Sequence, residues 1–123
     1  MKYILGFLLF GAIVISACTK DTVPEKIVDP IAVDPCLDTV SYSTTIVPLL
    51  NDNCVPCHNS SSASGGYDLS SYANVSASAD VVLHTIKQDD PANFAPMPQG
   101  GDKLPDPSIQ DFECWINQGK LNN

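Results

Sequence analysis

The pentapeptide Cys54-Val55-Pro56-Cys57-His58 constrains this chain more than any other feature, because it has the C-x-x-C-H spacing of covalent haem attachment. Two thiols separated by two residues can form thioethers with both vinyl groups of one haem, and the adjacent imidazole can bind the iron from the proximal side. A zinc site would need a second pair of ligands at matching spacing, and a thioredoxin-like dithiol would need a βαβ frame; the sequence has neither. The motif therefore predicts one haem c held by Cys54 and Cys57, with His58 as an iron ligand.

Residues 1–17 have the pattern of a bacterial lipoprotein signal peptide. Lys2 provides a positive charge, and residues 4–15 form an apolar run shorter than the roughly 20 residues needed to cross a bilayer. Small residues then precede Cys18, which resembles a lipobox whose first position, Ile15, is more often leucine. Cys18 is therefore expected to carry the lipid, with an ordinary cleaved signal or an uncleaved anchor as alternatives. Each of these places the mature domain outside the cytoplasm, where disulfides persist.

Residues 18–38 are predicted to form a lipid-anchored tether. They contain Pro24, Pro30 and Pro35 without a sustained periodicity, and at about 3.1 Å per residue such a segment would hold a domain roughly 50–60 Å from a membrane. No acidic residue follows Cys18 directly, which resembles the sorting pattern of outer-membrane lipoproteins. The folded domain is expected to span residues 39–123.

The mature chain is strongly acidic. Without residues 1–17 it has five lysines, no arginine and fourteen acidic residues, which gives a formal charge of −9. Binding of nucleic acid depends on Lys and Arg side chains that neutralise phosphates, so this composition argues against it. An acidic surface instead favours partners with basic docking patches, although the same charge also keeps a protein soluble.

Cys36 and Cys114 are the two cysteines that remain after Cys18 is assigned to lipid and the C-x-x-C pair to haem. An even remainder in an oxidising compartment predicts a disulfide, which would join the start of the domain to its last helix. The alternative is a pair of free buried thiols.

The periodicity predicts an all-α domain of short helices, because no useful alternating strand pattern occurs. The first helix is expected to start at Thr44 or Thr45 and to lead into the haem motif, and two short helices are expected over residues 69–76 and 81–87. The last helix should be N-capped by Asp106, with Pro107 at its first position and its end near Gly119. Its apolar stripe consists of Ile109, Phe112 and Ile116, with Trp115 beside the stripe.

Met97 is the predicted sixth ligand of the iron, on the side opposite His58. A methionine thioether is a neutral donor that raises the reduction potential, and Pro96 and Pro98 would hold it on a rigid irregular segment. His84 is the alternative ligand, because it is the only other histidine, but it lies on a predicted helix. A further alternative makes Met97 an ordinary core residue.

These features together resemble a class I monohaem cytochrome c, and they are most similar to the small lipoprotein cytochrome domains of Gram-negative bacteria. The resemblance covers about residues 41–121 and rests on a helix before the haem motif, residues 65–69, residues 96–98 and a terminal helix with Trp115 and Ile116. It implies a compact α-helical fold with crossed N- and C-terminal helices, an exposed haem edge, and His58 and Met97 as axial ligands. The Pro105-Asp106-Pro107 segment departs from the usual Ser and Asp before the last helix.

The expected function is that of an electron carrier, which passes single electrons between redox partners and turns over no substrate of its own. Two alternatives stay open. One is an open-site haem protein that binds a small ligand or reduces peroxide, and the other is a fixed haem subunit of a larger redox complex.

Overall fold

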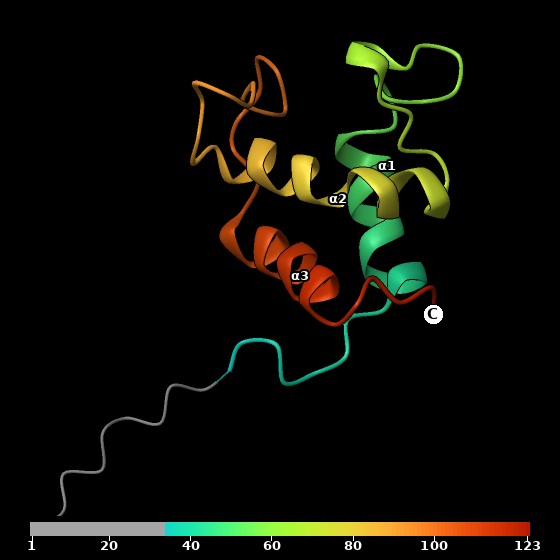
Figure 1. Cartoon of the computed structure of the whole chain (residues 1–123), viewed down its shortest axis with the longest axis vertical. Coiled ribbons are helices and arrows are strands. Elements are labelled where there is room, and N and C mark those ends of the chain that lie inside the picture. The colour runs from blue at the N-terminus through green and yellow to red at the C-terminus, as the bar shows by residue number, and fades with distance from the viewer. Residues whose placement is uncertain (1–33) are drawn as a thin grey trace, which may run out of the picture. The chain divides into compact units, whose positions relative to one another are not determined.

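The computed structural model describes residues 34–123, which form three α-helices and two short helical turns, with no strand among them (Figure 1). The elements are η1 (Tyr42–Ile46), α1 (Val47–Asn53), η2 (Ser64–Gly66), α2 (Tyr72–Lys87) and α3 (Asp106–Asn117). This part of the chain is all-α, as the sequence predicts. None of its helices is long and apolar enough to cross a membrane. The predicted signal peptide, Cys18 and the tether up to residue 33 lie outside the described residues.

The first helix begins at Tyr42, two or three residues earlier than predicted, with the π-helical turn η1, which continues directly into α1. The hydroxyl of Ser41 caps it by accepting the N–H of Thr44, 3.3 Å away. Two further N–H groups of its first turn find partners at the far end of the chain. The N–H of Tyr42 donates to the side-chain oxygen of Asn123 (2.8 Å), and that of Ser43 donates to its carbonyl oxygen (2.9 Å). These bonds satisfy donors that a helix start leaves without intrahelical partners.

Helix α2 is one helix of 16 residues, and the prediction of two short helices in this region is wrong. The side chain of Ser71 caps its start, and no glycine or proline interrupts residues 72–87, so the serine-rich stretch continues the helix. Leu69, the first residue of the predicted helix, is buried but precedes α2, and Ala73 within α2 is exposed. The buried face of α2 consists of Val75, Ala79, Val82 and Ile86.

Helix α3 starts with Asp106 as its first residue, so the prediction of Asp106 as the N-cap is wrong. Pro105 occupies the cap position, no side chain caps the helix, and the Asp106 carboxylate accepts from the ammonium group of Lys103 at 3.1 Å instead. The first turn is tied by the N–H groups of Ser108 and Ile109, which both donate to the carbonyl of Pro105. The helix is followed by Gly119 at a φ of 90°, as expected for a C-terminal stop.

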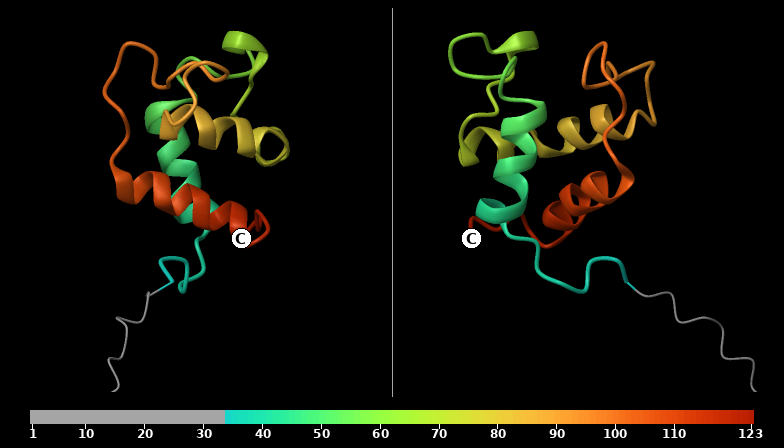
Figure 2. Two further views of the ribbon diagram at one scale, coloured as in Figure 1. Left: turned by 60° about the vertical axis from the view of Figure 1, so that its left-hand side comes forward. Right: turned by 180° about the vertical axis from the view of Figure 1, so that it is seen from behind.

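Trp115 lies in the core, on helix α3, whose place beside η1 and α2 Figure 2 shows from two further sides. Its side chain is fully buried, with ring centroids 5.4 Å from Tyr42 and 5.5 Å from Phe112. Its indole N–H donates to the carbonyl of Leu121 at 2.8 Å. Trp115 therefore joins the first turn, the last helix and the C-terminal tail, and α3 packs against both η1 and α2.

The segment from Cys36 to Val40 is fixed to the end of α3. Cys36 and Cys114 form a disulfide, with Cα atoms 5.2 Å apart. The amide of Gln118 donates to the carbonyls of Cys36 and Asp38, and its oxygen accepts the N–H of Val40 at 2.8 Å. The predicted tether reaches residue 38, but residues 36–38 are already attached to the domain by these contacts.

Removal of the disulfide in a Cys36→Ala, Cys114→Ala variant should lower the free energy of unfolding. The bond closes a sequence separation of 78 residues, for which the loss of loop-closure entropy gives an upper limit of about 4–5 kcal/mol. Urea unfolding of the variant should match that of the reduced wild-type protein. Mass spectrometry of the unreduced protein should find the two peptides linked, and alkylation of both thiols in that sample would contradict the pairing.

Candidate haem-binding site

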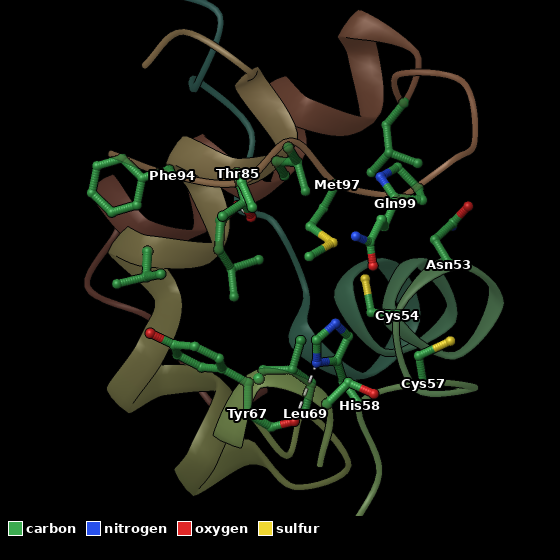
Figure 3. A pocket seen from close by; sticks show the side chains of 18 of the residues that line it. Asn53, Cys54, Cys57, His58, Tyr67, Leu69, Thr85, Phe94, Met97 and Gln99 are labelled. Atoms are coloured by element: carbon green, nitrogen blue, oxygen red, sulfur yellow. Dashed lines mark hydrogen bonds between the residues drawn. The ribbon is translucent and has the colours of Figure 1, made fainter. Parts of the chain in front are cut away.

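A cavity of about 530 Å³ opens between the end of α1, the loop that follows it, α2 and the segment before α3 (Figure 3). This volume lies within the range of small-molecule and cofactor sites. Its apolar wall includes four buried core residues, Leu69, Val82, Ile86 and Leu104. The predicted site residues Cys54, Cys57, His58 and Met97 all line this same cavity.

The end of α1 places Cys54, Cys57 and His58 of the C-x-x-C-H motif at one side of the cavity. The helix ends at Asn53, and one further turn is closed by the N–H groups of Cys57 and His58, which both donate to the carbonyl of Cys54. Both thiols are free; Cys54 is half-buried and Cys57 is exposed. The tight turn therefore brings both cysteines and the histidine to the cavity from a single short segment.

The imidazole of His58 is held in one tautomer by a backbone group. Its Nδ1 lies 3.3 Å from the carbonyl oxygen of Tyr67, and since a carbonyl can only accept, Nδ1 carries the proton. The carbonyl of His58 in turn accepts the N–H of Leu69 at 2.7 Å. Figure 3 shows the ring in the cavity, with the other nitrogen turned away from Tyr67. Metal-binding histidines usually donate their second ring N–H in this manner, which leaves Nε2 as the ligand atom.

The loop after His58 is held by its own hydrogen bonds, whereas the sequence suggests a flexible serine and glycine loop. The Asn59 amide donates to the carbonyl of Val55, and its oxygen accepts the N–H groups of Ser61 and Ser62. Gly65 and Gly66 have φ values of 64° and 85°, which favour glycine. The loop thereby returns the chain to Tyr67, whose carbonyl fixes the His58 ring.

Asp68 connects this loop to the start of α2. Its carboxylate accepts from the N–H and hydroxyl of Ser70 and from the side-chain amide of Asn74. The hydrogen bonds from Ser70, followed by that from Asn74, hold the pKa of Asp68 below its usual value. The position of Tyr67 beside His58 is thus secured by a neighbouring charged residue.

Met97 approaches the cavity from the segment between α2 and α3. Figure 3 shows its thioether sulfur in the cavity, on a different wall from the imidazole of His58. Its N–H donates to the carbonyl of Thr85 at 3.0 Å, and its carbonyl accepts from the side-chain amide of Gln88 at 3.1 Å. The sequence suggests only the flanking prolines as supports, so Thr85 and Gln88 are site residues that sequence reasoning missed.

His84, the alternative ligand, is not among the residues that line the cavity. Its Nδ1 lies 3.2 Å from the carboxylate of Asp89, and its ring stacks on Phe94 with centroids 4.8 Å apart and planes 13° from parallel. Phe94 itself lines the cavity. The structure therefore places Met97 in the cavity and His84 outside it.

Two other uses of the cysteine pair find no support in the geometry. Burial raises the pKa of the Cys54 thiol to about 11, whereas reactive dithiols depend on a lowered thiol pKa. Within residues 34–123, no group of three or more His, Cys, Asp or Glu side chains is close enough to hold a metal ion. The cysteines therefore stand beside one imidazole and one thioether, and not in a zinc-like cluster.

Comparisons of the chain with protein-family models, curated proteins and solved structures found no match.

Proposed function

We propose that this protein is a monohaem c-type cytochrome that carries single electrons between redox partners. The proposal rests on one observation above all: both cysteines of the C-x-x-C-H motif, its histidine and Met97 line one cavity. The donor set fits a haem, because it combines two attachment points with a nitrogen and a thioether as axial ligands. The apolar wall and the cavity volume of about 530 Å³ suit a large flat apolar group.

Each residue has a distinct role in this proposal. Cys54 and Cys57 would attach the cofactor covalently, His58 would bind the iron through Nε2, and Met97 would bind it from the other side. When bound, haem supplies a reversible one-electron couple. The carbonyl of Tyr67 orients the imidazole, while the thioether of Met97 would favour the reduced iron. With His58 and Met97 both bound to the iron, neither a substrate nor oxygen would have a coordination site.

We also propose that the domain is tethered outside the cytoplasm by a lipid on Cys18 and meets partners with basic docking patches. Residues 34–123 contain three lysines and eleven acidic residues. Two of the lysines are already neutralised: Lys87 pairs with Glu113 at 2.7 Å and Lys103 with Asp106 at 3.1 Å. The remaining negative charge would steer a basic partner, and salt should slow electron exchange with it.

The full chain, expressed with haem-maturation machinery, tests the proposal. The purified protein should keep one haem per chain through boiling in detergent, and the haem should titrate as a single one-electron couple. Carbon monoxide added to the reduced protein should leave its spectrum unchanged, since Met97 already occupies the sixth position. Loss of haem on denaturation would refute covalent attachment, and ready binding of carbon monoxide would favour an open-site haem protein.

A further inference from the structure

In the last turn of α2, the backbone carbonyl of Thr85 accepts a hydrogen bond from Met97. The last four carbonyls of an α-helix have no partner within the helix. At the end of α2, the carbonyl of His84 accepts the N–H of Gln88 at 3.0 Å, and the carbonyl of Thr85 accepts the N–H of Met97 at 3.0 Å. Pro96 and Pro98 have no N–H, so Met97 provides the only backbone donor within residues 96–98.

Gln88, the residue after α2, makes a second hydrogen bond to Met97, and its backbone conformation is uncommon. Its φ of 57° and ψ of 31° lie in the left-handed region, where the residue after a helix is usually glycine. A glutamine is strained there, but its side chain reaches across and donates to the Met97 carbonyl at 3.1 Å. The end of α2 thus binds both backbone polar groups of Met97.

In the described part of the chain, no other hydrogen bond joins residues 90–104 to α2. Within residues 90–104, the remaining hydrogen bonds connect neighbours in the segment or link Lys103 to Asp106. Besides the packing of its side chain against the core, Met97 is therefore held to α2 by the hydrogen bonds with Thr85 and Gln88. The contact with Thr85 uses a backbone carbonyl that every residue has, whereas the contact with Gln88 depends on the side chain.

We propose that Gln88 is a positioning residue for Met97, which it holds in place to keep the sixth coordination position closed. This inference rests on the proposed function, because it concerns the ligand of a bound haem. Without the Gln88 amide, the backbone of Met97 keeps one attachment instead of two. The thioether should then leave the iron more readily, and an external ligand should displace it at a lower concentration.

The test uses the haem-loaded full chain and imidazole as the competing ligand. Imidazole binding to the oxidised protein is followed by the loss of the methionine-to-iron charge-transfer band. In Gln88→Ala and in Gln88→Gly, half-displacement should need about 2–12-fold less imidazole, the factor that corresponds to one net hydrogen bond. Gln110→Ala, which removes an exposed glutamine of α3, should leave the imidazole requirement unchanged.

The two variants of Gln88 separate positioning from general stability. Glycine relieves the left-handed strain and alanine does not, so Gln88→Gly should have the higher thermal midpoint of the two. A positioning role predicts the same shift in imidazole affinity for both variants despite this difference. An unchanged imidazole affinity, or a shift that follows the thermal midpoint, overturns the role of Gln88 and leaves the proposed function intact. A wild-type protein without covalent haem, or without the methionine band, overturns both.

Discussion

A Cys54→Ala, Cys57→Ala variant is expected to lose haem staining completely and to fold poorly. The two sulfurs are the only attachment points that the cavity offers, so no thioether can form without them. Leu69, Val82, Ile86 and Leu104 line part of a cavity of about 530 Å³, and without the covalently held group this space would have no apolar group to fill it. Burial of the apolar surface of a haem in this cavity, at about 25 cal/mol per Å², would be a large contribution to the stability of a domain of this size.

Haem staining on a denaturing gel measures the loss of covalent haem, and far-ultraviolet circular dichroism measures the loss of folded structure. The Cys36→Ala, Cys114→Ala variant is the matched control, because it also removes two sulfurs but leaves the haem motif intact. It should keep its haem staining and lose only stability. Staining that persists after boiling in the Cys54→Ala, Cys57→Ala variant would mean that the cofactor is held elsewhere.

The parts of the fold that the sequence predicts are those encoded by neighbouring residues. The C-x-x-C-H spacing is a local motif, and the structure builds it as one turn after α1. The stripe of Ile109 and Phe112 has helical spacing and lies in the core, as predicted, but Trp115 is more deeply buried than Ile116. The pairing of Cys36 with Cys114 follows from counting cysteines, and the structure places the two at bonding distance.

The errors have two physical causes. The first is weak amphipathicity: the buried face of α2 includes the small Ala79 among serines, so the pattern suggests separate short helices where one continuous helix forms. The second is long-range hydrogen bonding. The carbonyl of Tyr67 orients His58, and the carbonyl of Thr85 accepts the N–H of Met97. Because every residue has a backbone carbonyl, the identity of these residues does not indicate in the sequence that they make these contacts. Gln88 could have been suspected only from its place directly after the last apolar turn of α2.

The second large effect concerns the sixth ligand, and it decides between an electron carrier and an open-site haem protein. Met97→Ala should abolish the methionine-to-iron band, shift the oxidised iron towards high spin, and allow water or added ligands to bind. Its reduction potential should fall by on the order of 0.1 V or more, because the thioether favours ferrous iron and axial ligands set potentials over about 0.8 V. Optical spectra and a redox titration of the purified variant measure these changes.

His84→Ala is the control, and it should leave the spectrum and the potential nearly unchanged. The His84 ring is stacked on Phe94 and hydrogen-bonded to Asp89, so both contacts would have to break before it could reach the iron. If His84→Ala alters the iron spectrum and Met97→Ala does not, the ligation is bis-histidine and Met97 is a core residue. If neither variant alters it, the sixth position is open in the wild-type protein. The acidic domain would then bind a small ligand at the haem, and the two hydrogen bonds that hold Met97 would serve only to pack the segment against α2.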